Sequence, residues 1–261
     1  MIDRVVNEYG VGYIKMDYNI EPGIGTELDA DSYGDGLLGH NRAYLEWLDG
    51  IFEKYPDLII ENCSSGGLRM DYAMLSRYSI QSTSDQEDYV RYATITANAP
   101  SAVTPEQAAV WSYPLTDGDC EEVIFNMVNA LLLRIHQSGH LVNLSPERFG
   151  YVKEAISYYK TIRHLTKKAL PYWPLGLSSY NDPWVSLGLE AEGKDFLAVW
   201  RRDSQSPVQE IPVKHLKGKE VEAVCAYPQS AECGFHWNKE AGTLTVELPE
   251  RVSARIFELR Y

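Results

Sequence analysis

The chain has 261 residues, of which 44% are hydrophobic, enough for one large globular domain or for a large and a small one. Its 24 basic and 37 acidic side chains give a formal net charge of −13, which excludes nucleic acid and anionic membranes as expected partners. No signal peptide and no apolar stretch of about 18 residues is apparent, so the default expectation is a cytoplasmic protein. The four cysteines have no metal-ligand spacing and are expected to be free thiols.

Strands and helices are expected to alternate through residue 168. Residues 1–10 predict the end of a helix that stops at Gly10, an unusual opening for a domain, so we expect part of a longer chain. Apolar runs predict strands at 11–17, 58–62 and 78–84, and helical periodicity predicts helices at 40–55, 87–98, 123–135 and 145–162, with a short helical patch near residue 74. This alternation indicates parallel β/α units.

The pattern changes at residues 171–174, Pro-Tyr-Trp-Pro. Beyond them, short antiparallel strands are predicted at 196–200, 221–225, 244–248 and 252–256. The sequence therefore predicts an α/β domain over residues 1–170 and a small antiparallel β-sandwich domain over residues 171–261.

Two aspartates, Asp17 and Asp85, follow predicted parallel strands. Parallel strands place their sites at their carboxyl ends, so these carboxylates are candidates for the acid/base or nucleophile pair of a hydrolase. An aspartate after a strand is also a common turn former or helix N-cap. The cap interpretation stays open for Asp85 and is weaker for Asp17, because no helix follows Asp17 at once.

Between them lies the turn Asn-Cys-Ser-Ser-Gly-Gly at residues 62–67. Its glycines allow close approach of the backbone to a ligand, or simply make a tight turn. Arg69 and Asp71 are expected to brace the turn as an ion pair. His136 and His140 are four residues apart, but they lack further ligands, so packing and hydrogen bonding are favoured over a metal site.

These segments together resemble family 36 glycoside hydrolases, the bacterial α-galactosidases. Residues 13–19, Tyr-Ile-Lys-Met-Asp-Tyr-Asn, resemble the nucleophile motif of that family, and residues 61–69 are similar to its Asn-Cys-Ser-x-Gly-Gly turn. Residues 83–85, Thr-Ser-Asp, match the strand that brings the acid/base aspartate, and residues 134–147 resemble the late-barrel segment. The resemblance covers nearly the whole chain.

The resemblance implies a retaining, exo-acting α-galactosidase that hydrolyses terminal α-linked galactose from oligosaccharides without a cofactor or metal. Asp17 would be the nucleophile and Asp85 the acid/base. The implied substrate-binding residues are Lys15, Asn19, Cys63 and Gly66. Lys15 shares a strand face with Asp17 and would hold it ionised, although an ordinary salt bridge is the alternative.

The implied fold is a partial (β/α)8 (TIM) barrel, with its late strands only, followed by the β-sandwich. In the family the nucleophile belongs to the fourth barrel strand, and this chain begins just before it. We therefore expect the isolated chain to be weakly active or inactive. We also expect it to form a homo-oligomer or to associate with the missing amino-terminal half.

Two departures from the family keep other functions open. Ser82 stands where many relatives have tryptophan, and residues 98–102 lack a histidine often found there. An α-N-acetylgalactosaminidase or an α-galactosyl transferase of the same family is therefore an alternative. A rival of another class is a catalytically incompetent carbohydrate-binding or assembly fragment.

Overall fold

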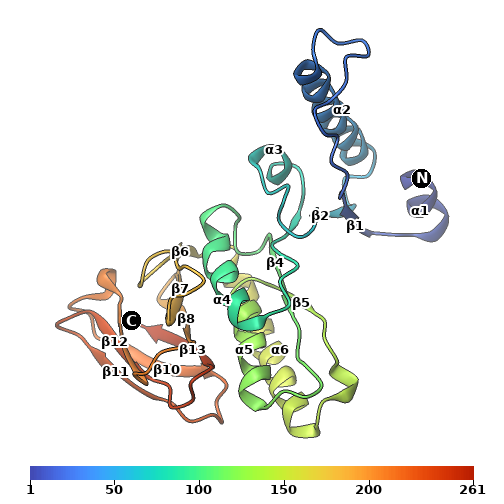
Figure 1. The fold of residues 1–261 in the computed structure, drawn as a ribbon. Helices are drawn as coiled ribbons and strands as arrows, with labels where there is room; N and C mark the ends of the chain where they lie inside the picture. Colours follow the sequence, from blue (N-terminus) through green and yellow to red (C-terminus); the bar gives the residue numbers. More distant parts are fainter. The chain divides into compact units, whose positions relative to one another are not determined.

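The structure, a computed structural model, describes all residues from 1 to 261. The chain divides into two compact units, residues 1–83 and residues 84–261 (Figure 1). This division does not test the expected domain boundary at residue 170, which stays a prediction. No helix combines the length and the apolar character needed to cross a membrane.

The first unit is a small parallel sheet with three helices. Its elements are α1 (Ile2–Tyr9), β1 (Tyr13–Asp17), α2 (Tyr33–Lys54), β2 (Ile59–Cys63), α3 (Tyr72–Leu75) and β3 (Ile80–Ser82). Strand β2 pairs in parallel with both β1 and β3. In this register Lys15 lies opposite Glu61 and Asp17 lies opposite Cys63, so the carboxyl ends of β1 and β2 meet at one edge. The predicted strands and their parallel order are confirmed.

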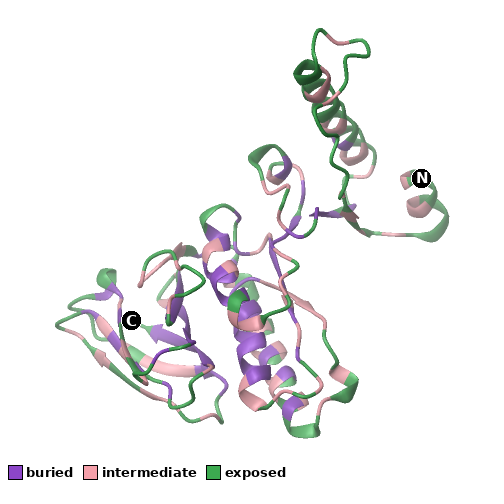
Figure 2. Cartoon of the chain, viewed as in Figure 1, coloured by how far each residue is buried: buried purple, intermediate pink, exposed green.

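Local signals explain where the helices of this unit begin and end. Helix α1 ends at Gly10, whose φ of 66° is the left-handed conformation that closes helices. Helix α2 begins seven residues before the predicted His40, because the Ser32 hydroxyl accepts a hydrogen bond from the Asp35 amide and caps it there. Figure 2 shows that α2 is largely exposed, and only Leu48 is fully buried.

The second unit begins with a helical part. Its elements are α4 (Tyr89–Asn98), the 3₁₀ turn η1 (Ala99–Ser101), β4 (Ala108–Ser112), α5 (Cys120–Leu131), β5 (Arg134–Gln137), the 3₁₀ turn η2 (Leu141–Asn143) and α6 (Pro146–Thr166). Strands β4 and β5 pair in parallel. Helix α5 is buried along almost its whole length (Figure 2).

Two antiparallel sheets follow. Their elements are β6 (Leu170–Tyr172), β7 (Trp184–Ala191), β8 (Lys194–Arg201), β9 (Val208–Pro212), the 3₁₀ turn η3 (Lys214–Leu216), β10 (Glu222–Tyr227), β11 (Gly234–Asn238), β12 (Thr243–Glu247) and β13 (Ser253–Arg260). One sheet has the order β10-β13-β8-β7-β6, and the other has the order β11-β12-β9. Residues of both sheets share one apolar core, which includes Leu197, Phe257, Leu244 and Val246. The predicted antiparallel strands are confirmed.

Polar contacts join the helical part of the second unit to its antiparallel sheets. The Arg255 guanidinium on β13 donates to both oxygens of Glu121 on α5, at 2.8 and 2.6 Å. The Trp173 indole donates to the Ala97 carbonyl at 2.6 Å. These contacts make residues 84–261 one compact body.

Strands β4 and β5 are absent from the prediction, and the helix predicted for residues 123–135 ends at Leu131. The run Leu131-Leu132-Leu133 is continuously apolar, so periodicity alone cannot separate the last helical turn from the next strand. Ile135 consequently lies in β5, where it pairs with Val110 of β4.

Candidate active site

Asp17 is the last residue of β1 at the carboxyl edge of the first unit's sheet. Alternation along the strand places Tyr13, Lys15 and Asp17 on its exposed face. The Asp17 carboxylate makes no hydrogen bond or ion pair with the chain. It is therefore an exposed carboxylate without a structural partner.

Cys63 ends the neighbouring strand β2 and is only 1% exposed. Its thiol lies beside the Gly66 amide, and the charges of Lys15 and Asp17 both act on it. Burial raises the pKa of this thiol, so the neutral form is favoured. The structure thus brings Lys15, Asp17, Cys63 and Gly66 together at one sheet edge.

The turn after Cys63 is held by the loop that follows β1. The Asn19 carboxamide oxygen accepts hydrogen bonds from the Ser65 amide at 2.7 Å and from the Ser65 hydroxyl at 3.3 Å. The Ser64 hydroxyl donates to the Tyr18 carbonyl at 2.7 Å. Asn19 therefore supports the turn directly, while its amide nitrogen is left for other contacts.

Glycine is required at the two positions of the turn for different reasons. Gly66 has a φ of 78°, a conformation that side chains rarely adopt. A Cβ on Gly67 would lie 2.6 Å from the Thr83 carbonyl oxygen, so close packing against the end of β3 requires glycine there. The tight-turn interpretation of this pair is confirmed, and it leaves a ligand-binding role for Gly66 a prediction.

The expected ion pair between Arg69 and Asp71 is wrong. Asp71 instead caps α3, where its carboxylate accepts from the Met74 amide at 3.1 Å. The Arg69 guanidinium donates to the carbonyls of Tyr18 and Ile20 at 3.2 and 2.7 Å. Arg69 thus braces the loop after Asp17. It does not pair with Asp71, because the amides at the start of α3 compete for the Asp71 carboxylate.

An aromatic cluster beside Asp17 was missed from the sequence. The Tyr18 ring lies 4.0 Å below the Arg69 guanidinium and is stacked on Tyr44 at 4.9 Å between centroids. The Tyr18 hydroxyl is 2.6 Å from Nε2 of His40. Tyr44 lies on α2, well beyond Tyr18 along the chain, and nothing in the local sequence pattern pairs the two residues.

Asp85 belongs to the second unit, in the segment that leads into α4. Its carboxylate is exposed and makes no hydrogen bond or ion pair with the chain. Asp88 is the N-cap of α4, with its carboxylate accepting from the amides of Val90 and Arg91 at 3.0 and 3.2 Å. The alternative that Asp85 caps the helix is therefore wrong.

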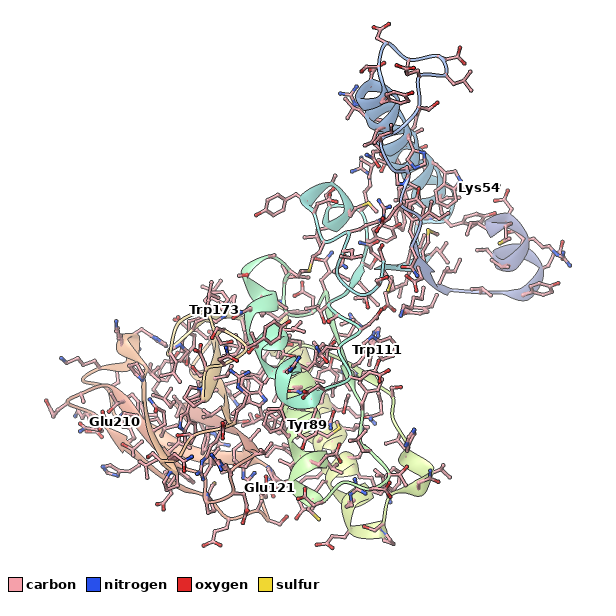
Figure 3. The ribbon with its side chains drawn as sticks, viewed as in Figure 1. Lys54, Tyr89, Trp111, Glu121, Trp173 and Glu210 are labelled. Atoms are coloured by element: carbon pink, nitrogen blue, oxygen red, sulfur yellow. The ribbon has the colours of Figure 1, made fainter.

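Two stacked aromatic side chains lie at the end of β4, and the second of them, Tyr113, is near Asp85. Burial raises the pKa of the Tyr113 hydroxyl, and the carboxylates of Asp85 and Glu87 raise it further. The Tyr113 ring stacks on Trp111, labelled in Figure 3, with centroids 6.0 Å apart. The sequence signal for this pair is the spacing of Trp111 and Tyr113 by two positions, which places both side chains on one face of an extended segment. Strand β4 itself was not predicted.

The loops after β4 and β5 line a cavity of about 720 Å³ in the second unit. Its wall includes Glu122, which is 4% exposed and accepts from Arg148 Nη2 at 2.9 Å. Burial raises the pKa of Glu122 despite this partner. His140, also in the wall, has Nδ1 2.7 Å from the Thr116 hydroxyl. The predicted hydrogen-bonding role of His140 is confirmed.

Packing also explains the other histidine. The His136 ring makes an edge contact with Trp111 at 5.2 Å. No group of three or more His, Cys, Asp or Glu side chains is arranged to hold a metal ion. All four cysteines are free thiols, as predicted.

The fold and the site define an α/β protein whose unpartnered carboxylates follow parallel strands. The Melibiase family model matches residues 1–167, and the chain belongs to this family. It is 24% identical over 189 residues to the alpha-galactosidase Mel36A of Lactobacillus acidophilus. That alignment covers 70% of this chain and 26% of Mel36A, so the chain spans about a quarter of this curated relative. The resemblance to family 36 is confirmed.

Solved structures of α-galactosidases share the fold. The galactosidase domain of alpha-galactosidase-sucrose kinase AgaSK has a TM-score of 0.76 at 20% identity, covering 99% of this chain and 36% of that one. The α-galactosidase of Lactobacillus brevis has a TM-score of 0.77 at 15% identity, with coverages of 99% and 37%. A variant of the GH36 enzyme AgaA from Geobacillus stearothermophilus, solved with stachyose, has a TM-score of 0.75 at 19% identity, with the same coverages.

Proposed function

We propose that this chain carries the two catalytic carboxylates of a retaining, exo-acting α-galactosidase. The observation that carries the proposal is that Asp17 and Asp85 both lack a structural partner. Neighbouring residues fill the roles that commonly explain such aspartates, because Asp88 caps α4 and Asn19 supports the turn. Membership of the Melibiase family supports the same function.

In the proposed mechanism Asp17 attacks the anomeric carbon while the bond to the leaving oxygen breaks. Asp85 gives its proton to that oxygen, and the sugar is left covalently bound to Asp17. Asp85 then takes a proton from water, which attacks the same carbon and releases Asp17 as a carboxylate. Two inversions retain the configuration, and this mechanism requires carboxyl groups about 5–5.5 Å apart.

Other side chains have supporting roles in this proposal. The Lys15 ammonium, two residues before Asp17 on the same strand face, favours the ionised nucleophile and donates to sugar hydroxyls. Asn19, Cys63 and Gly66 line the sugar side. Tyr113 lies on the leaving-group side because it neighbours the acid that protonates the leaving oxygen, and its ring offers a stacking surface.

The proposed substrates are oligosaccharides that end in α-linked galactose. AgaA variants have been solved with raffinose and with stachyose, which makes both sugars suitable test substrates. Ser82, which is 0% exposed beside Cys63 at the end of β3, stands where many relatives have tryptophan. N-acetylgalactosamine therefore remains an alternative for the bound sugar. The relative rates of hydrolysis of nitrophenyl α-galactoside and its N-acetyl analogue in a competition assay show which sugar is preferred. Disaccharide products formed in concentrated acceptor sugar would indicate transfer.

We also propose that the parallel strands are late strands of a (β/α)8 barrel over residues 1–170, followed by a β-sandwich domain over residues 171–261. Strand β1 pairs only with β2 within its unit, and Ile20, Ile24 and Leu28 in the loop after it are 65–79% exposed. These features support self-association or association with further barrel strands. Size-exclusion chromatography with light scattering tests this, and a monomer at micromolar concentration counts against self-association.

The decisive experiment follows hydrolysis of a nitrophenyl α-galactoside by the wild type, Asp17→Gly and Asp85→Asn. Asp88→Asn is the matched control, because asparagine caps helices as well as aspartate does. We expect Asp17→Gly to be inactive until azide is added, and the product to be the β-galactosyl azide. With raffinose as the substrate, whose leaving oxygen must be protonated, Asp85→Asn should lose about 10²–10⁴-fold in rate. Equal activity in the wild type and Asp17→Gly would refute the nucleophile role.

The rival proposal is a fragment that binds sugar without cleaving it, which the chain's coverage of 26% of Mel36A keeps open. It predicts no hydrolysis by the wild type but a thermal shift with galactose. Asp17→Asn should then alter the shift without changing any rate. Hydrolysis by the wild type alone that depends on Asp17 excludes this rival.

A further inference from the structure

Two of the four free cysteines lie together at the edge of the β-sandwich core, far in sequence from the proposed catalytic residues. Cys225 is on β10, and Cys233 lies just before β11, eight positions later. Both side chains pack against the same apolar core cluster, and the two thiols are close enough for each to shift the pKa of the other. A register shift between Cys225 and Tyr227 interrupts the pairing of β10 with β13 at this point, so the backbone here is less constrained than in a regular ladder.

A buried arginine accompanies the pair. Arg255 on β13 is 1% exposed, and its Nη2 donates to the Glu232 carbonyl at 3.2 Å, directly before Cys233. The positive charge of Arg255 also acts on the Cys233 thiol. The same guanidinium is held by Glu121, labelled in Figure 3, through two hydrogen bonds. A fixed positive charge therefore lies beside Cys233.

The contact between the thiols and the nearby charge act differently on the two sulphurs. The interaction with Cys225 lowers the pKa of Cys233 to about 7, burial opposes this shift, and the charge of Arg255 supports it. The pKa of Cys225 is raised by the same interaction and by burial. One sulphur of the pair is thus predisposed to be a thiolate and the other to remain a thiol, which is the division of roles in reactive dithiols.

Small molecules can reach the Cys225 end of the pair through a cavity, and Cys233 is partly exposed. Cys225 lines a cavity of about 660 Å³ between α6 and the sheet, together with Glu154, Tyr158 and Gln229. Both cysteines are half-buried, and neither is enclosed in the core. Cys63, in contrast, is 1% exposed.

We propose that Cys225 and Cys233 form a redox-active dithiol that hydroperoxides convert to an intramolecular disulfide. The Cys233 thiolate attacks one peroxide oxygen and becomes a sulfenic acid, while the other oxygen leaves as hydroxide and takes up a proton to form water. The Cys225 sulphur then attacks the sulfenic sulphur, its proton and the hydroxyl leave as a second water, and the S–S bond forms. The two thiols are oxidised by two electrons, and one hydrogen peroxide is reduced to two waters.

The test treats the whole chain with hydrogen peroxide in slight excess, blocks remaining thiols with iodoacetamide and measures intact mass and peptide maps. We expect two of the four cysteines to escape alkylation, a peptide linked through residues 225 and 233, and full reversal by dithiothreitol. Four alkylated cysteines after peroxide, or a disulfide that maps elsewhere, would overturn the proposal. Because this readout uses the wild type, it does not depend on the folding of any variant.

Variants then assign the roles. Cys225→Ser should stop at a Cys233 sulfenic acid that a dimedone probe traps. Cys233→Ser should react slowly at all three remaining cysteines, whereas Cys120→Ser should form the disulfide as the wild type does. In the untreated wild type at pH 7, Cys233 should be alkylated about tenfold faster than Cys120, whose thiol pKa is raised by burial. Equal pH profiles for Cys233 and Cys120 would contradict the assigned roles.

Discussion

The two nearby aspartates before α4 should separate stability from catalysis. Asp88 accepts hydrogen bonds from the Val90 and Arg91 amides, whereas Asp85 accepts none. Asp88→Ala therefore removes a helix cap, and Asp85→Ala removes a carboxylate that stabilises nothing in the chain. We expect the first substitution to lower stability and the second to lower activity.

The magnitude follows from the contacts. Loss of an N-cap aspartate typically costs about 1 kcal/mol, and here two amides lose their acceptor. The ion pair of Asp88 with Arg91 spans 3.4 Å between side chains that are 47% and 66% exposed, so it adds only about 0.3 kcal/mol. The total of about 1–1.5 kcal/mol corresponds to a fall in Tm of roughly 2–6 °C for a unit of this size. Asp85→Ala should stay within about 0.5 kcal/mol of the wild type.

Urea unfolding followed by circular dichroism gives the free energies, and the two compact units require a check for two separate transitions. Hydrolysis of nitrophenyl α-galactoside gives the rates on the same samples. Asp88→Asn is the control, since asparagine restores the cap without the charge. The reasoning is refuted if Asp85→Ala destabilises the chain as much as Asp88→Ala does, or if Asp88→Ala abolishes activity while the fold is intact.

Two further pairs of substitutions test the packing around the site. Gly67→Ala should destabilise the chain and disturb the turn, because its Cβ would meet the Thr83 carbonyl at 2.6 Å. Gly150→Ala, on an open face of α6, should instead stabilise the chain by about 0.5–1 kcal/mol. Thermal unfolding compares the two variants, and equal shifts in Tm would contradict the close contact between residue 67 and Thr83. Arg148→Met should cost about 3–5 kcal/mol because it leaves the Glu122 carboxylate buried and unpaired. Adding Glu122→Gln should recover part of that loss in urea unfolding, and no recovery would mean that the arginine acts mainly through its carbonyl contacts.

The sequence predicts the elements that carry the site better than it predicts their side-chain partners. Strands β1 and β2 are recognisable because each is a short, mainly apolar segment followed by a polar or Gly-rich loop, and Gly10 marks the end of α1. Helix α2 begins before its expected start because Ser32 caps it, and the three glycines in its first turns obscure the apolar period. Strand β4 was missed because a short apolar run has no period, and β5 was missed because the apolar run at residues 131–133 before it continues the helical pattern of α5.

Side-chain partners depend on competition that a linear pattern does not display. Asp71 is two residues from Arg69, but its carboxylate accepts a hydrogen bond from the Met74 amide of α3 instead. Similarly, Asp85 and Asp88 both precede α4, and only the backbone path decides which one reaches the exposed amides. The choice of cap depends on φ and ψ at one residue, which composition and spacing leave undetermined.

This competition sharpens the case for the two candidate carboxylates. Around Asp17, the hydrogen-bonding groups of Ser64, Ser65 and Arg69 are directed at the backbone or side chains of the adjacent loop, which fixes that loop. Fixed neighbours beside an unpartnered, exposed carboxylate are what a preorganised site requires, because the reacting group must be free while its surroundings do not move. An aspartate kept only as a turn former would instead be expected to accept from a nearby amide, and Asp17 does not.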